Sequence, residues 1–295
     1  MPPAPNDHPT LRFALDEAQK VLAGGPHPER ARRDTETLLL YVLRNNAPEM
    51  NLAWLIAHDG EPLAPGAADT FCDLVERRLF GEPMQYIIGE AEFYGLSFNV
   101  NRDVLIPRPE TEHLVEKAIA LAAEFARHKI VDVGTGSGAI AVALSHALPF
   151  AQIAATDISP AALAVAQSNA ARNGVADRVR FLEGELLEPV AGEQFDIVVS
   201  NPPYVPESDR NTLDEEVRNF EPGRALFAGA DGLDIYRRLI PAAFGALVSG
   251  GYVLLEIGYG QQEAMQALLK KEGFAGIEFI ADLQGIPRVA VARRP

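Results

Sequence analysis

The feature that most constrains the fold of this 295-residue chain is the alternation of short apolar segments with helical patterns from residue 107 to the end. Such alternation predicts a doubly wound α/β fold, in which helices cover a mostly parallel sheet. Residues 282–287 are too short a link for a parallel crossover, so we expect the sheet to end in one antiparallel strand. The seven predicted strands are Lys129–Val133, Gln152–Thr156, Val179–Leu182, Phe195–Ser200, Tyr252–Ile257, Ile277–Ala281 and Arg288–Ala292.

The first 83 residues show a different pattern. Apolar residues recur every three or four positions, which predicts an all-helical domain 1–83 whose first ten residues form a flexible arm. The predicted helices cover residues 11–22, 28–45, 52–57 and 65–80. Residues 84–106 are rich in β-branched and aromatic residues with turn-prone breaks. We therefore predict a β-hairpin linker over 84–106, followed by a larger domain over 107–295.

The composition limits the function classes. With 41 acidic and 26 basic residues the net charge is −15, which disfavours contact with nucleic-acid backbones or anionic membranes. No apolar run has the length of a membrane span, and the N-terminus lacks the pattern of a signal peptide. The single cysteine, Cys72, excludes an intrachain disulfide, and the six histidines are not spaced as metal ligands. We therefore expect a soluble, monomeric, cytoplasmic protein without a metal, in which Cys72 is buried.

The first motif is a glycine-rich turn between an apolar strand and a helix, at residues 134–138. Glycines let a backbone pass close to a ligand, and the helix N-terminus presents unpaired N–H groups. Asp157 ends the next strand, where its carboxylate could bridge two ribose hydroxyls. The pattern fits a nucleoside cofactor, but it does not separate NAD from S-adenosylmethionine. A glycine-rich turn that only permits close helix–sheet packing is a further alternative.

The second motif, Asn201-Pro202-Pro203-Tyr204, follows the fourth strand of the predicted sheet. In open α/β sheets, ligands bind at such a position beside the first strand. The prolines remove two N–H donors, so the neighbouring carbonyl groups can act as acceptors, and Asn201 adds a side-chain acceptor. Tyr204 supplies a flat face. This set suits the gripping of an –NH2 group on a planar system, as N-methylation of an amide or an exocyclic amine requires.

Together, Asp132–Gly138 and Asn201–Tyr204 resemble the motifs of amino-group methyltransferases that use S-adenosylmethionine. Further stretches make the chain resemble the release factor glutamine methyltransferases of the HemK/PrmC family. The resemblance covers nearly the whole chain, and it implies a seven-stranded methyltransferase fold with a helical substrate-recognition domain. The further matching stretches are Arg33–Leu39, Gly81–Gly89, Glu92–Gly95, Leu105–Glu112, Val217–Pro222 and Ala228–Leu233.

The resemblance implies methylation of the glutamine side-chain nitrogen in the Gly-Gly-Gln motif of peptide chain release factors. It assigns the substrate amide to Asn201, Pro202, Pro203 and Tyr204, with catalytic roles for Asn201, Pro202 and Tyr204. The implied cofactor contacts are Gly134, Thr135, Gly136, Ser137, Gly138, Asp157, Glu185, Leu186 and Asn201.

Some positions and functions remain open from the sequence. The family often has an aromatic residue where this chain has Leu186, although a leucine can also cover the face of an adenine ring. Glu110 and Glu112 fit the acidic first turn of a helix, and the role of Arg108 is undefined. A ribosomal-protein glutamine methyltransferase and an adenine-N6 methyltransferase are the alternatives. The acidic charge and the lack of a basic stretch disfavour the latter.

Overall fold

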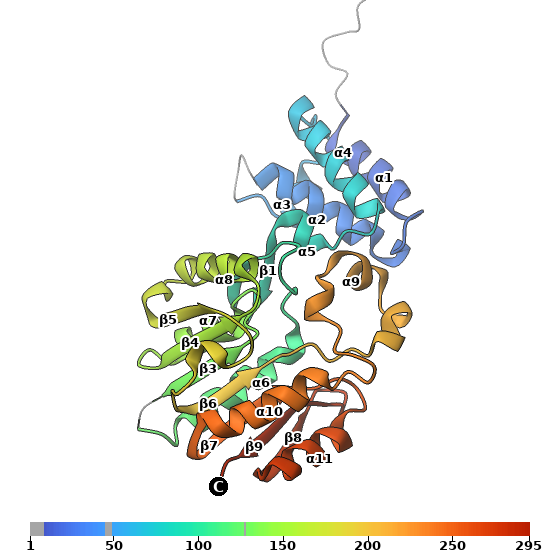
Figure 1. The fold of residues 1–295 in the computed structure, drawn as a ribbon. Helices are drawn as coiled ribbons and strands as arrows, with labels where there is room; N and C mark the ends of the chain where they lie inside the picture. Colours follow the sequence, from blue (N-terminus) through green and yellow to red (C-terminus); the bar gives the residue numbers. More distant parts are fainter. Residues whose placement is uncertain (1–8, 45–48, 127) are drawn as a thin grey trace, which may run out of the picture. The chain divides into compact units, whose positions relative to one another are not determined.

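The computed structural model describes residues 9–44, 49–126 and 128–295, which divide into two units (Figure 1). The helical unit comprises the described residues up to Gly89 together with Glu215–Phe220, and the sheet unit comprises 90–214 and 221–295. Most of the predicted flexible arm falls on residues 1–8, outside the described residues. Among the helices of the described ranges, none has both the length and the apolar character that a bilayer crossing needs.

The helical unit is built from helices whose starts the sequence encodes. Thr10 and Asn51 act as N-caps, because their side-chain oxygens accept hydrogen bonds from Phe13 N and Trp54 N at 3.2 and 3.0 Å. Leucines and one phenylalanine from several helices fill the core. The helices are α1 (Leu11–Leu22), α2 (Ala31–Arg44), α3 (Leu52–Ala57), α4 (Pro65–Leu79), α5 (Met84–Ile88) and α9 (Glu215–Phe220).

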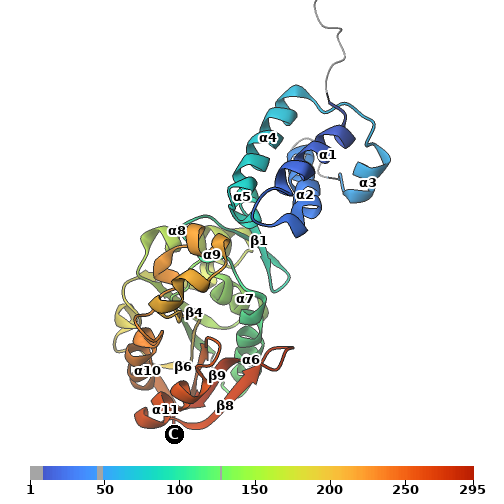
Figure 2. The same cartoon turned by 90° about the vertical axis from the view of Figure 1, so that its right-hand side faces the viewer.

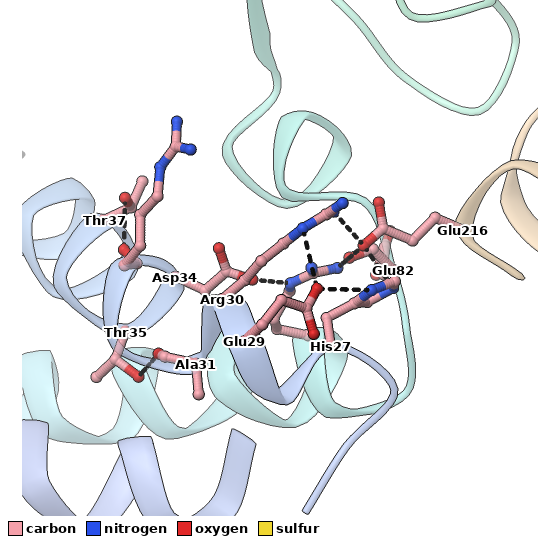
Figure 3. Close-up of polar contacts among 11 residues, drawn as sticks. His27, Glu29, Arg30, Ala31, Asp34, Thr35, Thr37, Glu82 and Glu216 are labelled. Carbon is pink, nitrogen blue, oxygen red and sulfur yellow. Dashed lines mark hydrogen bonds and ion pairs between the residues drawn. The ribbon is translucent and has the colours of Figure 1, made fainter. Parts of the chain in front are cut away.

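A buried arginine joins three segments of this unit. Arg78 on α4 is only 4% exposed, and its guanidinium lies 2.6 Å from a carboxylate oxygen of both Asp34 and Glu216. It also donates to the Glu82 carbonyl oxygen at 3.0 Å. Figure 3 shows Asp34, Glu82 and Glu216 within one cluster of polar contacts, with His27 beside Glu216. Because Glu216 lies on α9, this network ties an insertion from the sequence of the sheet unit into the helical unit.

Two expectations for this region were wrong. Met84–Ile88 is helical rather than extended, because Pro83 precedes a single helical turn that ends at Gly89 with φ +76°. The hairpin is consequently shorter than predicted, with β1 (Glu90–Phe93) paired antiparallel to β2 (Leu96–Asn99). Cys72 is exposed rather than buried, since the buried stripe of α4 runs through Phe71, Leu74 and Val75.

The seven-stranded sheet confirms the predicted fold class. Its order is β5-β4-β3-β6-β7-β9-β8, and the predicted antiparallel pairing of the last two strands is confirmed. The strand that opposes its neighbours is β9, which lies between β7 and β8 rather than at the edge. The strands are β3 (Lys129–Val133), β4 (Gln152–Asp157), β5 (Val179–Glu183), β6 (Phe195–Ser200), β7 (Leu247–Glu256), β8 (Ala275–Ala281) and β9 (Pro287–Arg293).

Helices cover both faces of the sheet (Figure 2). One apolar core lies between the sheet and α6, α7 and α8, and it includes the aromatic residues of the β1–β2 hairpin. The second core lies between the opposite face and α10 and α11. The bounds are α6 (Glu112–Ala122), α7 (Ala139–Ala147), α8 (Pro160–Arg172), α10 (Asp234–Ala246) and α11 (Gln262–Glu272). Buried on both faces, β3 and β6 have apolar residues at most positions; the exceptions are Lys129 and Asp132 in β3, and Asp196 and Ser200 in β6.

Candidate active site

A cavity opens where β3, β4 and β6 end at one edge of the sheet. β3 pairs with β4 on one side and with β6 on the other, so the strand order of the sheet reverses at β3. Ligands bind at such a point in open α/β sheets. The predicted site residues that line this cavity are Gly134, Thr135, Gly136, Ser137, Asp157, Glu185, Leu186, Asn201, Pro202 and Pro203.

The glycine-rich loop is fixed from beneath. Gly134 and Gly136 have φ of +72° and +54°, a region that favours glycine. Asp132, fully buried in β3, accepts hydrogen bonds from Thr135 Oγ1 at 2.6 Å and from Ala141 N at 3.2 Å. Burial raises the pKa of Asp132 to about 7. The carboxylate thus holds the loop to the start of α7 without lining the cavity itself.

Asp157 lies at the end of β4 and faces the cavity. One carboxylate oxygen accepts from Gly136 N and the other from Ser159 N, both at 2.8 Å. A carboxylate has about four lone-pair sites, so each oxygen keeps capacity for a further donor. The side chain can therefore hold the loop and still accept two hydroxyl groups.

Glu185 and Leu186 form the wall beyond β5. Glu185 pairs with Arg238 at 2.7 Å, and its hydrogen bond to this guanidinium lowers the pKa of the Glu185 carboxyl. Leu186 adopts φ +49°, and its carbonyl oxygen accepts from Thr156 Oγ1 at 2.7 Å. An apolar side chain is therefore held at the cavity wall, where the sequence predicted contact with adenine.

Asn201, at the end of β6, offers the most informative polar atom of the cavity. Its Nδ2 donates to Thr111 Oγ1 at 3.1 Å. Its Oδ1 is buried and accepts no hydrogen bond from the residues that the structure describes. A buried acceptor without a partner costs free energy, so its persistence points to a ligand that donates to it. Pro202 and Pro203 line the cavity next to this atom.

Two predicted site residues lie outside the cavity lining. Tyr204 packs into the core beside α10, and its hydroxyl donates to Glu256 Oε1 at 3.3 Å. Burial raises the pKa of Tyr204 well above its usual value. Gly138 has φ +80°, and a Cβ atom there would lie 3.0 Å from the Ala166 Cβ. In this structure, Gly138 permits the close packing of α7 on α8.

Sequence reasoning missed Thr111 and Glu256. Thr111 ends the short 3-10 helix η2 (Pro109–Thr111) and donates through Oγ1 to Glu256 Oε2 at 2.5 Å. Glu256 ends β7 and is 2% exposed. Burial raises its pKa to about 7, with Glu110 acting in the same direction and Arg288 against it. The available signal was a lone carboxylate at the end of an otherwise apolar strand.

The loop before η2 closes another side of the cavity. Arg108 lines the cavity and pairs with Glu221 at 2.5 Å, while the second oxygen of Glu221 accepts from Ile106 N at 3.2 Å. Glu112 begins α6, and its carboxylate accepts from Tyr94 N at 2.8 Å in the turn of the hairpin. Glu112 thus fixes the turn of the hairpin as well as beginning the helix.

Comparison with known proteins agrees with this geometry. A family model described as the methyltransferase small domain matches residues 111–219, and the PrmC N-terminal domain matches residues 14–89. Among solved structures, the catalytic domain of hMettl16 in complex with the MAT2A 3′UTR hairpin 6 has a TM-score of 0.56 and 16% identity, covering 86% of this chain and 92% of that chain. That likeness shows the fold, which is that of a methyltransferase.

Curated relatives define the family. The release factor glutamine methyltransferase of Koribacter versatilis is 41% identical over 97% of this chain and 99% of its own length. That of Moorella thermoacetica is 44% identical, with the same coverage of both chains. The chain therefore belongs to the family of release factor glutamine methyltransferases, as the motifs predicted, and it is an enzyme that transfers methyl groups.

Proposed function

We propose that this chain transfers a methyl group from S-adenosylmethionine to the glutamine side-chain nitrogen in the Gly-Gly-Gln motif of peptide chain release factors. The observation that carries the proposal is the Oδ1 atom of Asn201, a cavity-lining residue: this acceptor is buried and accepts no hydrogen bond from the described residues. An amide –NH2 group is a donor of the kind that this acceptor lacks. The names of the curated relatives support the same substrate.

The residues of the cavity fit S-adenosylmethionine. Asp157 retains lone pairs for the two ribose hydroxyls, and the loop at Gly134 and Gly136 exposes backbone without side chains. Leu186 provides an apolar surface for a flat base. When bound, the cofactor supplies a methyl group on a positively charged sulfur. Asp157 and the loop would hold it, and Asn201 would face the substrate side.

The chain's own residues make the amide nitrogen reactive by orientation. The lone pair of an amide nitrogen is delocalised into its carbonyl, which makes the nitrogen a poor nucleophile. If Asn201 Oδ1 and the Pro202 carbonyl oxygen accept its two N–H groups, the nitrogen is fixed and its lone pair has one direction. Positive charge grows on this nitrogen during transfer, and the two acceptors stabilise that charge. Once the new N–C bond has formed, one of the two N–H protons leaves to water, so that the product amide is neutral. Fixed position supplies much of the remaining rate enhancement.

The substrate is tested by offering the wild-type enzyme three acceptors side by side: a release factor, a ribosomal protein and a DNA duplex. We expect a mass increase of one methyl group on the glutamine of the Gly-Gly-Gln peptide, and none when that glutamine is replaced by alanine. Methylation of the ribosomal protein or of adenine, with the release factor unmodified, would overturn the proposed substrate.

Asn201 is tested by two substitutions. Asn201→Ala removes the acceptor, and the loss of one polar group that acts mainly in the transition state lowers turnover about 10²–10³-fold. Asn201→Asp keeps an acceptor but adds a negative charge near the sulfonium, so we expect lower turnover with equal or tighter cofactor binding. Single-turnover rates and calorimetry separate the two effects. Wild-type turnover of Asn201→Ala on the natural protein would limit Asn201 to a structural role.

The helical unit is proposed to recognise the release factor. It carries none of the residues that line the cavity, and residues 14–89 match the PrmC N-terminal domain. The proposed setting is the cytoplasm, with the enzyme acting as a monomer on a folded protein substrate. Size-exclusion chromatography with light scattering tests the monomeric state. Pull-down with the release factor tests recognition of the protein substrate.

A further inference from the structure

The Asn201 amide is one end of a buried chain of hydrogen bonds. Asn201 Nδ2 donates to Thr111 Oγ1 at 3.1 Å, and Thr111 Oγ1 donates to Glu256 Oε2 at 2.5 Å. The three residues come from the end of β6, from η2 and from the end of β7. Thr111 is 4% exposed and Glu256 is 2% exposed. The fold thus brings together three groups that are far apart in sequence: Asn201 and Thr111 line the cavity, and Glu256 lies behind them.

The donors and acceptors of these hydrogen bonds follow one direction, from Asn201 through Thr111 to Glu256. When Glu256 is ionised, its carboxylate can only accept hydrogen bonds, so the single proton of the Thr111 hydroxyl is then committed to Glu256. The Thr111 oxygen can then only accept from its other neighbour. Asn201 must therefore turn its –NH2 group toward Thr111, which leaves Oδ1 as the end of the amide without a partner among the described residues. With the amide reversed, two acceptors would face each other at Thr111, and a donor would face the substrate –NH2 group.

The carboxylate at the other end is itself held in place. Tyr204 donates its hydroxyl to Glu256 Oε1 at 3.3 Å, and Tyr236 donates to the Glu256 backbone oxygen at 2.6 Å. Burying a carboxylate is costly unless its oxygens are satisfied, and here each oxygen receives one hydroxyl. Hydrogen bonds through Glu256 and Thr111 therefore connect Tyr204 to Asn201.

We propose that Thr111, oriented by Glu256, is a positioning residue that sets which end of the Asn201 amide meets the substrate. The inference rests on the proposed function, since it concerns the acceptor that holds the glutamine –NH2 group. Thr111 touches no reacting atom in this account. It acts through Asn201 alone, and this restriction makes the role separable from a general contribution to folding.

Thr111→Val tests the role, because it keeps the shape of the side chain and removes both hydrogen bonds. We expect turnover on the release factor to fall about 10- to 100-fold, with little change in KM for the release factor or in cofactor affinity. Thr111→Ser retains the hydroxyl and should restore turnover to near the wild-type value. Ser145→Ala is the matched control, because Ser145 is a fully buried hydroxyl on α7 in the same unit. It should turn over like the wild type.

A double-mutant cycle shows whether Thr111 acts through Asn201. If it does, Thr111→Val has no further effect on turnover in the Asn201→Ala background. Equal losses in both backgrounds, or wild-type turnover of Thr111→Val, would overturn the proposal. Should Thr111→Val not fold, Glu256→Gln replaces it in the cycle, since a carboxamide can offer either an acceptor or a donor to Thr111. Failure of the wild type to methylate release factor would instead refute the proposed function.

Discussion

Asp157→Ala offers a quantitative test of the cofactor site. Both Asp157 oxygens already accept backbone N–H groups at 2.8 Å, so the carboxylate is held rigidly where it faces the cavity. Hydrogen bonds to a charged acceptor contribute about 1.5–3 kcal/mol each. Water compensates part of the loss when the side chain is removed, and a net loss of about 2.7 kcal/mol corresponds to about 100-fold weaker binding. We expect S-adenosylmethionine affinity to fall about 100-fold, and at least about tenfold.

Calorimetry with S-adenosylmethionine measures this loss. Glu183→Ala is the matched control, because Glu183 ends the neighbouring strand β5 and is paired in register with Asp157 but does not line the cavity. A cofactor analogue that lacks one ribose hydroxyl separates the direct bond from loosening of the glycine-rich loop. The analogue should bind the wild type more weakly than S-adenosylmethionine, and Asp157→Ala should bind both with similar affinity. Undiminished affinity of Asp157→Ala for S-adenosylmethionine would refute the reasoning.

Three further substitutions probe stability. Burial raises the pKa of Glu256 from 4.5 to about 7, so its contribution to stability is present below about pH 4.5 and is lost as the pH rises toward 7. The free energy of unfolding should therefore fall more between about pH 5 and about pH 8 in the wild type than in Glu256→Gln. Denaturant titrations at the two pH values measure this difference. Gly138→Ala forces a Cβ atom against Ala166 at positive φ and should cost about 1–3 kcal/mol of unfolding free energy, measured in urea. Arg78→Met leaves the buried Asp34 carboxylate without its partner and should lower stability by about 3 kcal/mol. Unchanged urea midpoints would contradict the last two.

Local patterns were sufficient to predict the sheet and the position of the cavity. Strands β3 and β6 are mostly apolar, β3 leads directly into Gly134 and β6 into Asn201, and parallel neighbours place their carboxyl ends at one edge. The adjacency of Gly134 and Asn201 follows from that arrangement. What periodicity could not give was the strand order at the far edge, where β9 enters between β7 and β8.

The remaining differences have tertiary causes. The composition of Met84–Ile88 favours a strand, but its flanking Pro83 and Gly89 fit a single helical turn with Tyr86 and Ile87 buried. Helix α9 belongs to the helical unit because Glu216 reaches Arg78, a contact between residues far apart in the sequence. No local pattern encodes such a pairing, so the domain boundaries predicted from sequence lacked this insertion.

The same reasoning explains why Thr111, which lines the cavity, and Glu256 behind it were not predicted as site residues. Three buried carboxylates fix the loops around the cavity: Asp132, which closely precedes the glycine-rich loop, Glu221 for the loop before η2, and Glu256 for Thr111 and hence Asn201. A motif reveals the atoms that meet a ligand, whereas the groups that aim those atoms are identified only by distance. Because burial raises the pKa of Glu256 to about 7, acidification protonates a carboxyl that can then donate to Thr111 as well as accept from it. The orientation of the Asn201 amide should then be less strictly fixed, and turnover should fall as the pH is lowered through about 7.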